Sequence, residues 1–264
     1  MESNTTLLAL KGVTKRFGGV QALDGVDFEV HSHEVVGLVG DNGAGKSTLV
    51  KTIAGIYTPD EGRYYFDGRE VSIKSPQDAA ALGIATVYQD LALCDNLDVV
   101  ANLFLGRELI SNGPGALAHQ LDEIRMEHRT RDLLRHLAVT IPSLRSEVGT
   151  LSGGQRQQVA VARSLLGEPK VVLLDEPTAA LGVAQTAQVL NLIKRLRDQG
   201  LGVVVISHNL GDVFEVADRI VVLRLGCLAG DFDTASTDQA EVVAAMTGAV
   251  GADTVNGEYV GGAR

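Results

Sequence analysis

Two kinds of hydrophobic pattern follow one another along this chain. From Val26 to Val30, apolar residues alternate with acidic ones, the period-2 pattern of a strand with one buried face. Residues 64–66 and the pair Val71 and Ile73 flank Asp67-Gly68, a dipeptide typical of the tight turn of a hairpin. We therefore predict a small antiparallel sheet in the first part of the chain.

Other apolar runs lack this alternation. Val35–Val39, Val171–Leu174 and Val203–Ile206 are short and continuously apolar, as in parallel strands that are buried on both faces. A helix ending near Gly200 is predicted between the last two runs, with one apolar face formed by Val189, Leu192, Ile193 and Leu196. Strand, helix and strand at this spacing predict a parallel βαβ unit.

The middle of the chain interrupts this α/β pattern. From about residue 91 to 148 there is no strong strand candidate; residues 111–115 resemble a loop, and Arg125–Leu137 has a helical pattern. We predict a helical subdomain inserted at about 91–165 into a single domain of residues 1–248. A short helix is expected near Asp238–Met246, with Ser236 and Gln239 as its capping box. Residues 249–264 form a Gly-rich C-terminal tail, and no internal repeat is present.

Composition narrows the possible partners. The 264 residues are 45% hydrophobic and 21% charged, with a formal net charge of −10, which disfavours general binding to nucleic acid. The two cysteines, Cys94 and Cys227, suit a reducing compartment and have no metal-ligand spacing. No basic and apolar leader opens the sequence, and no apolar run is long enough to span a membrane. A membrane role would therefore have to come through a partner.

A glycine-rich stretch follows the apolar run Val35–Val39 and precedes a predicted helix, Lys46–Ala54. It fits the pattern G-x-x-x-x-G-K-[S/T], whose backbone N–H groups surround phosphates. We expect Lys46 to neutralise the β- and γ-phosphates and Ser47 to offer an oxygen to Mg²⁺. The expected binding residues are Gly40, Asp41, Asn42, Gly43, Ala44, Gly45, Lys46, Ser47 and Thr48.

Two carboxylates end the apolar run Val171–Leu174. Adjacent carboxylates repel each other, so a buried pair is tolerated best near a cation. We expect Asp175 to hold Mg²⁺, either by direct coordination or from just outside its ligands. We expect Glu176 to act as the general base that activates water for attack on the γ-phosphate. A solvated turn before Pro177 is the alternative interpretation of this pair.

Three single residues complete the predicted site. His208 follows the run Val203–Ile206, where an imidazole could reach the γ-phosphate; a core or capping histidine is the alternative. Gln89 ends the stretch Ile84–Tyr88, and its amide suits contact with Mg²⁺ and the attacking water. Phe17, before Gly18-Gly19, is a candidate for stacking on adenine, or equally a core residue.

A second anion receptor lies far along the chain at Leu151–Gln155. Ser152, Gly153, Gly154 and Gln155 open a predicted helix and offer a hydroxyl, backbone N–H groups and a positive helix end. Two such receptors in one small domain raise the question of whether they serve one ligand between them.

Taken together and in this order, these motifs resemble those of the ATP-binding cassette (ABC) ATPases, over about residues 7–230. The Leu-Ser-Gly-Gly-Gln run is highly specific to that family. The resemblance implies an α/β fold, with a P-loop NTPase, RecA-like core, an antiparallel β arm and an inserted helical subdomain. It also implies Mg²⁺ and a head-to-tail dimer, with each ATP between Gly40–Thr48 of one copy and Ser152–Gln155 of the other. By position, Glu176 is the base, His208 contacts the γ-phosphate, and Gln89 links Mg²⁺ to the helical subdomain.

Within the family, the sequence around Gly40–Thr48, Val87–Asp90, Asn102–Arg107 and Ile206–Asn209 resembles bacterial importers of ribose, xylose and fructose. The implied partners are transmembrane permease subunits and, indirectly, a solute-binding protein; the implied location is peripheral, on the cytoplasmic face of the inner membrane. The permease is expected to dock near Leu91–Arg107, with Leu93, Leu97 and Phe104 exposed. An amino-acid or lipid transporter is the nearer alternative, and a soluble ATPase acting on ribosomes or DNA the more distant one.

Two positions depart from the family pattern. Ala179-Ala180-Leu181-Gly182 has glycine where an aspartate usually communicates across the dimer, a change that is common in the sugar branch. His33 stands where a glycine is frequent, and we interpret it as a surface turn residue without a functional role.

Overall fold

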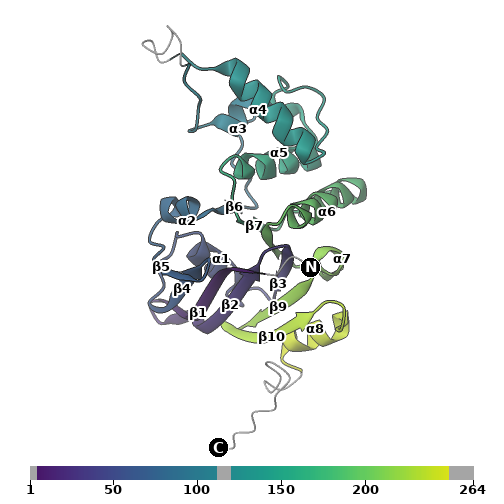
Figure 1. The fold of residues 1–264 in the computed structure, drawn as a ribbon. Helices are drawn as coiled ribbons and strands as arrows, with labels where there is room; N and C mark the ends of the chain where they lie inside the picture. Colours follow the sequence, from purple (N-terminus) through teal and green to yellow (C-terminus); the bar gives the residue numbers. More distant parts are fainter. Residues whose placement is uncertain (1–4, 112–119, 250–264) are drawn as a thin grey trace, which may run out of the picture.

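The computed structural model describes residues 5–111 and 120–249. Most of the predicted tail at 249–264 and of the predicted loop at 111–115 lies outside the described residues. The first part of the chain forms a four-stranded antiparallel sheet of order β2-β1-β4-β5 (Figure 1). Its strands are β1 (Thr6–Phe17), β2 (Val20–His31), β4 (Glu61–Phe66) and β5 (Arg69–Val71).

A second sheet of six strands has the order β10-β9-β3-β8-β7-β6 and is parallel except for β10. The predicted buried runs are its strands β3 (Glu34–Val39), β7 (Val171–Asp175) and β8 (Gly202–Ile206). The remaining strands are β6 (Ile84–Val87), β9 (Arg219–Arg224) and β10 (Cys227–Asp233). Each of the three runs is buried on both faces, which confirms why they lack alternation.

The helices surround this sheet and extend beyond one end of it (Figure 1). Figure 1 places α3, α4 and α5 together at the upper end, away from the antiparallel sheet. Their bounds, with those of the other helices, are α1 (Lys46–Ile53), α2 (Pro76–Leu82), α3 (Val99–Phe104), α4 (Glu123–His136), the 3₁₀ turn η2 (Val148–Thr150), α5 (Gly153–Leu165), α6 (Val183–Asp198), α7 (Leu210–Val216) and α8 (Gln239–Thr247).

The core has two halves, one on each face of the parallel sheet. Val36 and Leu38 of β3 join the half formed with α1 and the antiparallel sheet. Val35 and Val39, from the same strand, join the half formed with α3 to α8. Alternate side chains of one strand therefore fix the antiparallel sheet and the helices on opposite sides.

Local signals account for most element boundaries. The predicted hairpin is confirmed, because Asp67 and Gly68 have φ angles of 48° and 73° between β4 and β5. The predicted capping box of the last helix is wrong: Asp238 caps α8 by accepting from the Glu241 N–H at 2.9 Å. Ser236 is not available for this role, since its hydroxyl lies 3.3 Å from the Asp233 carbonyl in a preceding turn.

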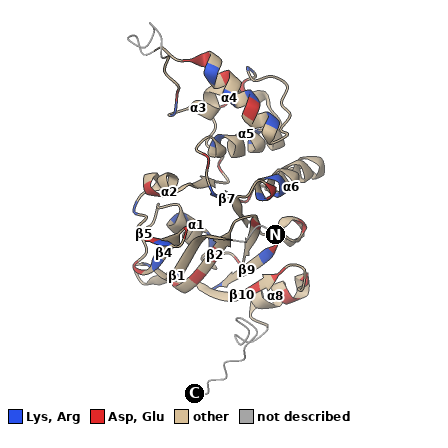
Figure 2. Ribbon diagram, viewed as in Figure 1, with Lys and Arg blue, Asp and Glu red and all other residues tan. Residues whose placement is uncertain are grey.

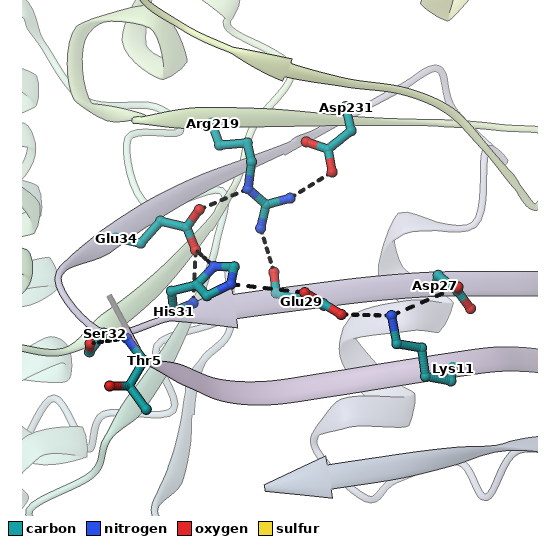
Figure 3. Close-up of polar contacts among 9 residues, drawn as sticks. All are labelled: Thr5, Lys11, Asp27, Glu29, His31, Ser32, Glu34, Arg219 and Asp231. Carbon is teal, nitrogen blue, oxygen red and sulfur yellow. Dashed lines mark hydrogen bonds and ion pairs between the residues drawn. The ribbon is translucent and has the colours of Figure 1, made fainter. Parts of the chain in front are cut away.

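A charged cluster fastens the two sheets to each other (Figure 3). Arg219 on β9 donates to Glu34 on β3 at 2.8 Å, to Asp231 on β10 at 2.8 Å, and to the carbonyl of Glu29 on β2 at 2.7 Å. Glu34 also accepts from the backbone N–H of His31 at 2.8 Å. Burial alone would raise the pKa of Glu34, but the Arg219 and His31 contacts outweigh it and hold that pKa below its usual value.

Ion pairs also hold the group of α3 and α4 together. Arg145 lies 3.2 Å from Asp98, the N-cap of α3, and 3.0 Å from Glu127 on α4. Figure 2 shows acidic and basic residues interleaved along α4. Since the Arg145 side chain is 48% exposed in both pairs, we expect each pair to contribute little to stability. Within the described residues, no helix is long and apolar enough to cross a membrane.

Candidate active site

The glycine-rich loop lies between the end of β3 and the start of α1. Gly40 has a φ of 147°, and a Cβ there would lie 2.2 Å from the Leu223 carbonyl oxygen. Gly45, with a φ of 108°, would bring a Cβ within 2.7 Å of the Ala22 carbonyl oxygen. No other residue type fits these two positions, so the loop packs closely against β9 and β2. The first N–H groups of α1 have no partner within the helix and open onto this loop.

Lys46 directs its ammonium into the loop. Its Nζ donates to the carbonyl oxygens of Gly40 and Asp41, the latter at 3.0 Å. Burial lowers the pKa of Lys46, against the opposing effects of Glu176, Asp41 and Asp175. The predicted loop residues Asp41, Asn42, Gly43 and Ser47 are exposed, whereas Ala44 is buried in the core and supports the loop from beneath.

The two carboxylates end β7 beside this loop. Asp175 is paired in register with Ile206 of β8, and the Glu176 N–H donates to the Ile206 carbonyl at 2.9 Å. Burial and the neighbouring Glu176 raise the pKa of Asp175, whereas Lys51 and Lys46 act to lower it. Glu176 is held in a left-handed conformation, with a φ of 51°.

His208 contacts the carboxylate of Glu176. The Nδ1 atom of His208 lies 2.8 Å from Oε2 of Glu176, and the histidine side chain is 75% exposed. The alternative of a core histidine is therefore wrong. Because β3, β8 and β7 are adjacent and parallel, their carboxyl ends bring Gly40, His208 and Asp175-Glu176 to one edge of the sheet. The sequence-predicted neighbours thus do lie together.

Gln89 lies at this edge of the parallel sheet, whereas Phe17 belongs to the antiparallel sheet. Gln89 is exposed and follows β6, the strand next to β7. Phe17 ends β1 and is 42% exposed, so it is not a core residue. Its ring meets that of Tyr57 edge-on, with 5.0 Å between centroids. Tyr57 was missed by the sequence analysis, since nothing in the sequence brings it next to a residue 40 positions earlier.

The second receptor, Ser152–Gln155, opens α5 in the other part of the molecule (Figure 1). Ser152 accepts from the Gln155 N–H at 3.3 Å, and Gln155 accepts from the Ser152 N–H at 3.0 Å, a complete capping box. Gly154 is buried against α6, where a Cβ would lie 2.9 Å from the Cβ of Gln185. The close contact explains the need for glycine at this position.

The departures from the family pattern have simple structural settings. Gly182 is the N-cap of α6, and its N–H lies 3.4 Å from Oε1 of Gln185. His33 is exposed in the turn between β2 and β3 with a φ of 58°, a conformation that glycine adopts at lower cost.

A groove of about 310 Å³ runs between α2, β6, α3 and α5. Leu91, Leu105, Arg107 and Arg163 contribute to its lining. The expected exposure of Phe104 is wrong: this ring is 3% exposed because it lies on the inner face of α3 and packs into the core. Leu105, where the helix ends, is 47% exposed instead.

Several curated proteins are similar in sequence to this chain over more than nine-tenths of its length. The chain is 47% identical to the fructose import ATP-binding protein FrcA of Rhizobium meliloti, over 92% of this chain and 94% of the relative. It is 46% identical to the xylose/arabinose import ATP-binding protein XylG of Sulfolobus acidocaldarius, over 91% and 94%. The ribose import ATP-binding protein RbsA 1 of Rubrobacter xylanophilus is 43% identical, and the chain spans 47% of its length.

Solved structures have the same fold. The ADP conformation of an ATP-binding cassette of an ABC transporter superposes with a TM-score of 0.77 at 28% identity, covering 92% of this chain and 95% of that one. A dimeric bacterial ABC transporter cassette superposes with a TM-score of 0.71 at 26% identity, covering 86% and 99%. The ABC transporter family model matches residues 23–179. The chain has a phosphate loop, two carboxylates at the end of a strand, and a signature helix, α5, that is capped by the Leu-Ser-Gly-Gly-Gln run. It belongs to the ABC transporter family, as an ATP-binding cassette ATPase.

Proposed function

We propose that this chain is the ATP-hydrolysing subunit of an importer for a monosaccharide. One observation carries the proposal: identities of 47% and 46% to fructose and xylose/arabinose import ATP-binding proteins extend over 94% of each relative. A cassette supplies energy, whereas solute recognition belongs to its partner proteins. The proposal therefore names the class of solute and leaves the individual sugar to experiment.

The hydrolytic step uses residues at the sheet edge. The loop Gly40–Thr48 holds the phosphates of ATP, and Lys46 neutralises their charge. A water oxygen bonds to the γ-phosphorus as the bond from that phosphorus to the bridging oxygen of ADP breaks. Glu176 takes the proton from this water. His208 contacts Glu176 through Nδ1 at 2.8 Å, which leaves its other ring nitrogen for the γ-phosphate.

The residues present fit a magnesium ion bound together with the nucleotide. Ser47 offers a hydroxyl at the start of α1, and the raised pKa of Asp175 reflects a partly buried carboxylate beside another one, an arrangement that a cation relieves. Mg²⁺ prefers one or two protein oxygens plus phosphates. Ser47, Asp175 and Gln89 would hold it, and it would neutralise charge on the phosphates. Within the described residues, no cluster of three or more His, Cys, Asp or Glu side chains forms a separate metal site.

The position of the signature helix supports a head-to-tail dimer. In one copy, Ser152–Gln155 opens α5 in the upper part of the molecule, away from the loop Gly40–Thr48 (Figure 1). Two copies in opposite orientation would bring each receptor to the other's ATP. One solved structure similar to this chain is a dimeric cassette. ATP binding would then close the dimer and hydrolysis at Glu176 would reopen it.

The partners follow from the same assignment. Permease subunits would dock at the groove lined by Leu91, Leu105, Arg107 and Arg163, beside Gln89. Residues 91–165, as an inserted helical subdomain of the single domain 1–248, would transmit the motion to them. The chain would be peripheral, on the cytoplasmic face of the inner membrane. A solute-binding protein would deliver the sugar to the permease.

The catalytic assignment is tested with Glu176→Gln. We expect steady-state phosphate release to fall by at least about 100-fold, the usual contribution of a general base, while ATP still drives dimer formation in size-exclusion chromatography. Glu70→Gln, which changes an exposed carboxylate on β5, is the matched control and should hydrolyse ATP normally. Normal turnover by Glu176→Gln would refute the role of Glu176.

The transport assignment is tested on the native complex purified from membranes. A polytopic permease should copurify with the chain, and after reconstitution a pentose or hexose with its binding protein should stimulate ATP hydrolysis. Stimulation by amino acids or lipids instead would overturn the sugar assignment. Copurification with ribosomes or nucleic acid, without a permease, would overturn transport altogether.

A further inference from the structure

We infer that Tyr57 is a positioning residue for the adenine base, acting through Phe17. The inference rests on the proposed function, in which the Phe17 ring stacks on adenine. Tyr57 belongs to none of the motifs that identify the family in this sequence. Its ring lies 5.0 Å from that of Phe17, centroid to centroid, with 70° between the ring planes. This T-shaped geometry is a preferred arrangement for aromatic pairs, and it fixes the tilt of both rings.

Strand β2 and helix α1 connect this pair to the phosphate loop. Phe17 ends β1 opposite Val20, at the start of β2. A few residues further along β2, the Ala22 carbonyl oxygen and the Leu23 side chain pack against Gly45 of the loop. Tyr57 follows the end of α1: its N–H donates to the carbonyl of Lys51, in the last turn of the helix that the loop begins. In the proposed binding mode, a nucleotide whose phosphates occupy the loop would extend its base to this pair.

A half-exposed phenylalanine needs support if it is to present one constant face. An unsupported ring at 42% exposure would sample several orientations and would lose that freedom when a base stacks on it. Here the Lys15 ammonium lies over the Phe17 ring, 5.6 Å from its centroid, and is itself held by Asp60 at 2.9 Å. With Lys15 over the ring and Tyr57 in a T-shaped contact, the orientation of Phe17 is set before the nucleotide arrives.

The support of Phe17 by Tyr57 should strengthen binding of the base and leave binding of the phosphates unchanged. Removing the Tyr57 ring frees Phe17, so ATP binding should weaken by roughly three- to tenfold, the range that corresponds to a typical aromatic pair. Inorganic tripolyphosphate has no base and should bind as before. Since the contact is between rings, the hydroxyl is not needed and Tyr57→Phe should retain the affinity for ATP.

The experiment measures dissociation constants of ATP and of tripolyphosphate by isothermal titration. The proteins are the unaltered chain, Tyr57→Leu, Tyr57→Phe, Phe17→Ala and the double variant Phe17→Ala/Tyr57→Leu. Tyr65→Leu removes a half-buried tyrosine ring from β4, opposite Ala9, and is the matched control. We expect Tyr57→Leu to weaken ATP alone, and to cost nothing further once Phe17 is alanine, because its effect passes through that ring.

Three results would overturn the inference. The first is that Tyr57→Leu weakens the binding of ATP and of tripolyphosphate equally. The second is that Tyr57→Leu weakens ATP binding as much in the Phe17→Ala background as alone, and the third is that Phe17→Ala leaves the affinity for ATP unchanged. Failure of the ATP-binding role on which the inference rests looks different, since the unaltered chain would then bind neither ATP nor tripolyphosphate at the loop.

Discussion

Replacing Arg219 by methionine tests the charged cluster that fastens the two sheets. The change preserves much of the volume of the side chain and removes its charge. It leaves the Glu34 carboxylate, whose side chain is 7% exposed, without its cation. Breaking a buried pair by removing one partner costs about 3–5 kcal/mol. With a urea m value of roughly 3 kcal/mol/M, a loss of about 4 kcal/mol lowers the unfolding midpoint by roughly 1.3 M.

The loss of stability caused by Arg219→Met should depend on pH. In the unaltered chain the pKa of Glu34 is lowered, so the pair stabilises the fold above the unfolded-state pKa of about 4.3 and fails only in acid. Without Arg219, only the His31 hydrogen bonds oppose the effect of burial, so we expect the pKa of Glu34 to be higher in the variant than in the unaltered chain. The unaltered chain then gains stability relative to the variant as pH rises between those two pKa values, so the penalty should be larger at pH 7 than at pH 5.

Urea unfolding followed by circular dichroism at both pH values measures this penalty. Lys11→Met is the matched control: it removes a cation 2.6 Å from Glu29 at an exposed pair on the same cluster, and it should cost less than about 1 kcal/mol. The double variant Glu34→Gln/Arg219→Met should recover part of the loss, because no charge stays buried. A penalty below about 1 kcal/mol, or one that is equal at pH 5 and pH 7, would refute the reasoning.

Two further predictions concern the site. Gly154→Ala should lower stability by about 1–3 kcal/mol, seen as a lower Tm, because its Cβ would lie 2.9 Å from that of Gln185. Gly182→Ala, with nothing within 4 Å of the added Cβ, should lower Tm by less, because it has only the weaker N-cap preference of alanine against it. Equal losses in the two variants would contradict the packing argument. Asp175→Asn should raise the Tm of the nucleotide-free protein at pH 7 and less so near pH 4, since burial and Glu176 raise the pKa of Asp175 and its charge destabilises the fold. A gain that does not vary with pH would exclude this cause.

Local patterns predicted the elements that form the candidate active site. The glycine-rich loop, the strand-end carboxylates and His208 each follow a continuous apolar run, and parallel strands bring such ends together. Two local predictions failed because another residue or the packing of the core had the stronger effect. Asp238 displaced Ser236 as a helix cap, and Phe104 turned inward because its position on α3 faces the core.

Contacts between distant segments were beyond sequence reasoning. Arg219 and Glu34 are 185 positions apart, and only the pairing of β9 with β3 brings them together. The Phe17–Tyr57 contact depends in the same way on how β1 approaches the end of α1. Pairs of this kind follow from tertiary packing, for which a single sequence has no periodic signal.

The left-handed backbone at Glu176 has a consequence for how such proteins diverge. A residue with a Cβ is strained there by about 1–2 kcal/mol, whereas glycine is not and asparagine tolerates the conformation better than most. Under the proposed catalytic role, selection for hydrolysis would keep glutamate at this position against that preference. In a duplicated gene copy that is no longer selected for hydrolysis, replacing Glu176 by glycine or asparagine would abolish ATP hydrolysis and stabilise the fold in one step. In related cassettes that no longer hydrolyse ATP, we therefore expect position 176 to be among the first to lose its glutamate.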